Sequence, residues 1–160
     1  CQTTRCRTAA RTATADFAMT ADVSSHALAA THKAAFGRQE GWGAGDFAGY
    51  LTDPKALVFG TELCFALVRL AGPEAEILTL ATHPDVQRHG RATTLLRNAL
   101  RHLAAVNVQE VFLDVSDQNT AARALYARCG FTGFSIRPNY YKNGTSAICM
   151  KAVLSAESSD

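Results

Sequence analysis

The chain has 160 residues, of which 48% are hydrophobic and 19% charged, and its formal net charge is +2. This length and composition predict one soluble globular domain with a sizeable core. The small net charge is not enough to bind nucleic acid or a membrane surface by electrostatic attraction alone. The apolar runs are too short to span a membrane. We therefore expect no nucleic-acid or membrane partner.

The cysteines form no CxxC pair and no tight framework, which predicts reduced thiols in a cytoplasmic protein. They are Cys1, Cys6, Cys64, Cys129 and Cys149. Residues 1–15 are rich in Thr, Ala and Arg and contain no acid. They resemble an organelle-targeting remnant, but a disordered tail or an added extension is favoured. We therefore expect a single domain over residues 16–154 and a C-terminal tail over 155–160.

The first predicted elements are a short strand and a helix within residues 16–36. Asp22 or Ser24 can cap this helix, and Gly37 can end it. The glycine-rich segment that follows matches neither G-x-G-x-x-G nor the P-loop pattern, which favours a flexible connection into a short helix. Trp42 in this connection is either a core anchor or an aromatic that contacts substrate.

Six more strands are predicted from apolar runs, at residues 56–60, 63–72, 76–83, 110–116, 131–137 and 145–154. The strand 76–83 is apolar on both faces, as expected inside a covered sheet. Its alternation assigns Ile77, Thr79 and Ala81 to one face and Leu78, Leu80 and Thr82 to the other.

Two more helices are predicted between these strands. The first has an apolar stripe at helical spacing, made of Ala92, Leu95, Leu96, Ala99, Leu100 and Leu103. The second, in "TAARALYARCG", has Asn119 as its cap and Gly130 as its stop. Strands that alternate with helices and end in a strand pair predict an α/β protein, with one mixed sheet and helices on both faces.

The loop "QRHGRAT", residues 87–93, leads onto the first of these helices. Free N–H groups and the positive end of a helix favour an anion there, and a glycine allows close approach. Arg88 and Arg91 add positive charge where a pyrophosphate would lie. On its own this pattern is weak evidence for a phosphate site, and a plain helix start is the favoured explanation.

The same loop resembles the acetyl-CoA-binding signature of the GNAT acetyltransferase superfamily, Q/R-x-x-G-x-G/A. Together with "LDVSDQNTAARALYARCGF" and "SIRPNYY", it resembles bacterial ribosomal-protein-alanine N-acetyltransferases from about Glu74 to Tyr141. The resemblance implies the GNAT fold, with about seven mostly antiparallel strands. It also implies acetyl-CoA as co-substrate and no metal.

The resemblance further implies the cofactor contacts. Strand backbone at Leu80, Ala81 and Thr82 would hold the pantetheine arm and the acetyl group. Main-chain N–H groups would wrap the pyrophosphate at Arg88, His89, Gly90, Arg91, Ala92 and Thr93, where Ala92 replaces the second glycine of the signature. Asn119 would contact the cofactor in addition to capping its helix.

Amine acetylation requires a neutral amine and a proton for the departing thiolate. Tyr126 on its own reads as a core tyrosine, and the resemblance implies that it protonates the coenzyme A sulfur. Asp114 interrupts an apolar strand, so it faces solvent or lines a polar site. The family has a glutamate there as proton acceptor, and Glu76 resembles the base of histone-type members. A third alternative is that neither carboxylate acts.

Paired tyrosines at Tyr140 and Tyr141 follow a strand and can line a peptide groove, or simply pack. The resemblance favours a peptide or protein N-terminus as the acceptor, with a ribosomal protein as the leading candidate. Its amine would attack acetyl-CoA directly in a ternary complex. The alternatives are a GNAT enzyme acting on a small amine or a lysine, and a non-catalytic acyl-CoA-binding module. Cys129 is expected to be a buried structural thiol rather than an acyl carrier.

Overall fold

A six-stranded mixed sheet forms the centre of the computed structural model, which describes residues 23–37 and 42–155. Its elements in chain order are α2 (Ser25–Phe36), α3 (Ala44–Thr52), β1 (Ala56–Thr61), β2 (Cys64–Ala71), β3 (Glu74–Thr82), the 3-10 turn η2 (Pro84–Val86), α4 (Arg91–Ala105), β4 (Glu110–Ser116), α5 (Thr120–Arg128), β5 (Thr132–Arg137) and β6 (Ala147–Val153). The expected strand before α2 and the two expected tails lie outside the described residues, apart from Ser155.

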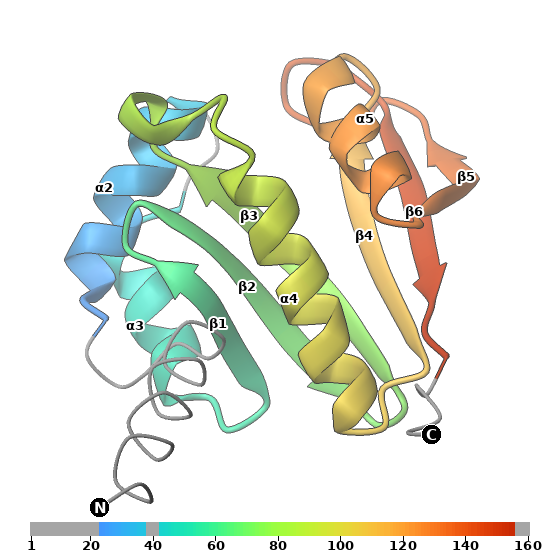
Figure 1. Cartoon of the computed structure of the whole chain (residues 1–160). Helices are drawn as coiled ribbons and strands as arrows, with labels where there is room; N and C mark the ends of the chain where they lie inside the picture. The colour runs from blue at the N-terminus through green and yellow to red at the C-terminus, as the bar shows by residue number, and fades with distance from the viewer. Residues whose placement is uncertain (1–22, 38–41, 156–160) are drawn as a thin grey trace, which may run out of the picture.

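The strands lie in the order β1-β2-β3-β4-β6-β5. All neighbours are antiparallel except β3 and β4, which are parallel and are joined through α4. Helices α4 and α5 cover one face of the sheet, and α2 and α3 cover the other (Figure 1). The prediction of a mixed, mostly antiparallel sheet with helices on both faces is confirmed.

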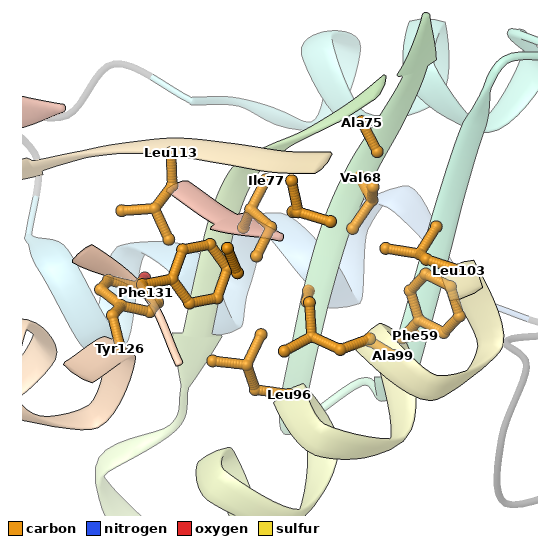
Figure 2. Close-up of a cluster of buried hydrophobic side chains, with 14 of the residues drawn as sticks. Phe59, Val68, Ala75, Ile77, Leu96, Ala99, Leu103, Leu113, Tyr126 and Phe131 are labelled. Carbon is orange, nitrogen blue, oxygen red and sulfur yellow. The ribbon is translucent and has the colours of Figure 1, made fainter. Parts of the chain in front are cut away.

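Successive side chains of β2 pack alternately into two separate hydrophobic cores. Ala66 and Val68 pack beneath α4, whose apolar stripe is buried as predicted. Phe65 and Leu67 pack on the opposite face, against α2 and α3. Figure 2 shows the larger of the two cores. The period-2 alternation of a strand covered on both faces explains why β2 is apolar and buried from Cys64 to Val68.

A β-bulge interrupts β3. Leu67 is paired with Thr79 but Val68 is paired with Ile77, so Leu78 is an extra residue on β3. The predicted strict alternation in this strand is therefore wrong. Ile77 packs in the core beneath α4, whereas Ala81 packs in the core beneath α2 and α3. One inserted residue moves every later side chain of the strand to the opposite face of the sheet, and it also bends the strand.

The pairing of β3 with β4 is short. It runs only from Glu74 opposite Glu110 to Glu76 opposite Phe112 and ends just before the bulge. Beyond this point the two strands separate (Figure 1). From Ile77 to Thr82 the edge of β3 that faces β4 is therefore left without a strand partner in the described chain.

Candidate functional site

A cavity of about 600 Å³ opens where β3 and β4 separate, and its walls come from β3, β4, α5, α2 and the loop after β5. The predicted site residues that line it are Trp42, Glu76, Leu80, Asp114, Asn119, Tyr126, Tyr140 and Tyr141. They come from both halves of the chain, so the short β3–β4 pairing is what creates the shared space.

The predicted pyrophosphate loop lies beside this cavity rather than in its wall. Its residues, Arg88 to Thr93, stand at the start of α4, and Ala81 and Thr82 end the strand that leads to it; none of them lines the cavity. Gly90 is the N-cap with φ of 69°, and Arg88 has φ of 67°. The side chain of Gln87 donates to the carbonyl of Thr82 at 2.9 Å, which ties the loop to β3.

The first turn of α4 is suited to an anion. Gly90 offers no capping side chain, and the first turn contains no acidic residue. The backbone N–H of Thr94 donates to the carbonyl of Gly90, so the N–H groups of the three preceding residues begin the helix without an intrahelical acceptor. Their positive end, beside the exposed Arg88 and Arg91, fits the phosphates of a coenzyme.

Tyr126 lies on α5 with only 7% of its surface exposed, and its ring packs edge-on against Phe131 at the end of the larger core (Figure 2). Burial, and after it the charge of Tyr141, raises the pKa of its hydroxyl to about 12. The hydroxyl thus stays protonated at neutral pH. Asn119 begins the same helix and accepts a hydrogen bond from the backbone N–H of Ala122 at 3.1 Å, as predicted for a cap.

Glu76 and Asp114 both face the α2/α3 side of the sheet, because the residues on either side of each pack into the opposite core. Their surroundings differ. Glu76 is exposed and makes no ion pair with any described residue. Asp114 is half-buried, and its Oδ2 lies 3.6 Å from an amino nitrogen of Arg137.

The tyrosine pair forms another wall. The rings of Tyr140 and Tyr141 meet edge-on with centroids 5.1 Å apart, and Tyr140 remains 51% exposed. The backbone N–H of Tyr141 donates to the carbonyl of Thr145, which closes a turn after β5. Trp42 stacks on Tyr50 with centroids 5.5 Å apart, so it both anchors α3 and lines the cavity.

His32 is a cavity residue that the sequence interpretation missed. It is 2% exposed, and its ring lies within 6 Å of the rings of Phe36, Trp42 and Phe47. Burial lowers its pKa to about 4, so it is neutral at pH 7. The helical spacing in the sequence could have indicated its burial, because His32 follows Leu28 by one turn and lies beside Thr31 on the buried face of α2.

Cys129 follows α5 and packs, half-buried, against the larger core. Burial raises the pKa of its thiol, although Arg97 and Arg128 oppose this effect, and a thiol of raised pKa is a weak nucleophile. No group of three or more His, Cys, Asp or Glu side chains within residues 23–37 and 42–155 could hold a metal ion. No helix in these ranges is long and apolar enough to cross a membrane.

Comparison with known proteins identifies what this arrangement resembles. Residues 15–131 match the acetyltransferase (GNAT) family. A segment of 82 residues is 37% identical to the [ribosomal protein bS18]-alanine N-acetyltransferase of Escherichia coli K12, covering 51% of this chain and 55% of the relative. The chain thus spans about half the length of the curated relatives it matches.

Two further comparisons broaden this result. The crystal structure of the Escherichia coli ribosomal-protein-S18-alanine N-acetyltransferase superposes with a TM-score of 0.76 at 28% identity, covering 88% of this chain and 95% of that one. A 67-residue segment is 40% identical to the mycothiol acetyltransferase of Geodermatophilus obscurus, covering 41% of this chain and 22% of that protein.

Proposed function

The chain belongs to the acetyltransferase (GNAT) family, and we propose that it transfers an acetyl group from acetyl-CoA to the N-terminal amine of a protein. The observation that carries this proposal is the buried, protonated Tyr126 in the wall of a cavity that two carboxylates also line. The similarity to ribosomal-protein-alanine acetyltransferases supports an N-terminal alanine as the acceptor residue.

The chain's own groups match the parts of the cofactor. The N–H groups at the start of α4 would hold the pyrophosphate, with Arg88 and Arg91 beside it. The unpaired edge of β3 at Leu80 to Thr82 would hold the pantetheine arm by backbone hydrogen bonds, as an added strand would. Acetyl-CoA supplies the thioester whose acetyl group is transferred.

Tyr126 supplies the proton that the reaction requires. As the amine nitrogen bonds to the acetyl carbon, the carbon–sulfur bond breaks and the sulfur takes the hydroxyl proton. Burial makes a thiolate unfavourable there, and it makes the tyrosinate left by the transfer unfavourable too. The tyrosinate therefore regains a proton from solvent, to which the proton released by the amine is ultimately passed. The proton lost by the amine goes to a carboxylate or to solvent. An α-amine, with a pKa of about 8, loses it more readily than a lysine at about 10.4.

A small amine is the second candidate acceptor, because a relative is named for mycothiol. A panel of three acceptors separates the candidates: a lysine-free peptide with N-terminal alanine, the same peptide blocked at its N-terminus and carrying one lysine, and spermidine. We expect release of free coenzyme A thiol and a mass gain of one acetyl group with the first peptide, at ten times or more the kcat/KM of the others. Transfer to spermidine alone would contradict the N-terminal acceptor, and cofactor binding without transfer would indicate a non-catalytic module.

A further inference from the structure

A row of polar side chains crosses the outer strands on the face turned away from α4 and α5. Asp114 on β4 stands directly opposite Cys149 on β6, which stands opposite Ser135 on β5. Side chains of directly opposed residues share a face, and so does the residue two places along the strand. Arg137 is therefore a diagonal neighbour of Cys149, and its side chain reaches across β6 to Asp114.

A continuous series of contacts leads from this row to the cavity. The Asp114 carboxylate lies 3.6 Å from the Arg137 guanidinium, whose central carbon lies 5.5 Å from the centre of the Tyr140 ring. Tyr140 packs edge-on against Tyr141. Tyr141 in turn is close enough to affect the ionisation of Tyr126. Arg137 thus links a strand carboxylate to the loop that carries both tyrosines.

The Asp114 carboxylate is already engaged on two sides. Besides Arg137, it contacts the Cys149 thiol, where burial first and then a hydrogen bond to Asp114 raise the thiol pKa. The ion pair at Oδ2 and the thiol contact reduce the room that an acceptor amine has at this carboxylate. Glu76, exposed in the same cavity and without an ion-pair partner in the described chain, presents no such competition.

We propose that Asp114 is a positioning residue, which through Arg137 fixes the Tyr140–Tyr141 loop against the acceptor, and that it does not accept the amine proton. This inference rests on the proposed acetyl transfer and assigns the carboxylate a different task within it. The Arg137 side chain is 57% exposed, and exposed ion pairs are weak, so the effect on acceptor binding is modest.

The test is a double-mutant cycle with Asp114→Asn, Arg137→Met and the double variant, assayed for acetyl transfer to the best acceptor of the panel. Each single variant is expected to raise the acceptor KM about three- to tenfold and to change kcat less than about twofold. The double variant should be no worse than either single one, because both remove the same contact. Arg137→Lys should recover part of the loss, since it keeps the charge but not the planar group over Tyr140.

Glu110→Gln is the matched control. Glu110 lies on the same strand as Asp114 and pairs with Lys151 at the same distance, 3.6 Å, but it does not line the cavity. Its loss should leave KM and kcat unchanged. Thermal unfolding of all variants shows whether a change in KM reflects the loop or a loss of folded protein.

The pH dependence distinguishes positioning from proton transfer. If Asp114 accepted the proton, Asp114→Asn would lower kcat by about 100-fold or more, and the loss would shrink as pH rises through the amine pKa of about 8. That result would overturn the inference and leave the proposed function intact. If the ratio of the wild-type kcat to the Asp114→Asn kcat stays constant between about pH 7 and 9.5, positioning is supported. If the wild type acetylates only spermidine, the proposed acceptor is wrong, and the cycle is then measured with spermidine, where an unchanged KM in both single variants would overturn the inference.

Discussion

Tyr126 belongs to the core and to the cavity at once. Its ring fills space beside Phe131, and its pKa of about 12 is a consequence of that burial. A tyrosine at a helical core position is ordinary, so its spacing on α5 alone could not separate packing from catalysis. Its place in the cavity wall, together with the family to which the chain belongs, favours the catalytic role.

Tyr126→Phe should lower kcat by about 100-fold or more, because positioned acids typically contribute that much, while the ring keeps its packing. Coenzyme A release with the alanine peptide measures the loss, and thermal unfolding should show little change. Tyr50→Phe is the matched control, because Tyr50 stacks on Trp42 but does not line the cavity. Undiminished transfer in the Tyr126 variant would refute its role as the acid.

His32 makes stability depend on pH. Its pKa is about 4 when folded and about 6.5 when unfolded, so the unfolded state binds the proton first. The free energy of unfolding should therefore fall by about 2–3 kcal/mol as pH drops from about 6.5 to 4. Urea unfolding across this range measures the slope. His32→Phe should reduce the slope, and His26→Gln, at an exposed position of the same helix, should not. Equal slopes in wild type and His32→Phe would assign the effect to other groups.

At the scale of elements, sequence predicts the regular parts of this fold well. The apolar stripe of α4 and the Asn119 cap of α5 depend on residues close in sequence, and both were predicted correctly. The bulge at Leu78 was missed because an apolar residue fits either face of a covered strand. The Asp114–Arg137 contact was also missed, because it depends on the register of β4, β6 and β5 rather than on local sequence.

The loop before α4 depends on one backbone conformation. Gly90 has φ of 69°, where an alanine costs roughly 1–2 kcal/mol, and a Cβ there would meet no atom of the described protein. Gly90→Ala should therefore lower stability and also raise the KM for acetyl-CoA about tenfold or more, because it disturbs the N–H groups that would face the pyrophosphate.

Gly72→Ala is the control for this substitution. Gly72 also has positive φ, 61°, and open space around it, but it lies in the turn between β2 and β3, away from the cavity. It should lower stability by a similar amount and leave the acetyl-CoA KM unchanged. Equal effects of both variants on that KM would mean that the Gly90 loop does not contact the cofactor.

At the scale of the whole molecule, the sheet consists of two parts, β1–β3 and β4–β6, joined by three residue pairs between β3 and β4. Of the candidate cofactor contacts, Leu80 on β3 and Asn119 and Tyr126 at α5 line the cavity between the two parts, and the start of α4 lies beside it. A ligand that uses both sets would bind only when the two parts are held together, so binding should stabilise the folded state as a unit.

Coenzyme A at about 100 times its Kd should raise the free energy of unfolding by about 2.7 kcal/mol, because it binds the folded chain and not the unfolded one. Calorimetry measures this shift, and hydrogen exchange locates it. Those backbone amides of residues 77–82 that point to the unpaired edge of β3 should exchange more slowly than the global shift alone requires, because strand-like contacts to the ligand would cover them. The exchange rates of amides in β1, at the far edge of the sheet, should fall only as much as the overall stabilisation requires. Stabilisation without extra protection of residues 77–82 would show that the cofactor does not lie between the two parts.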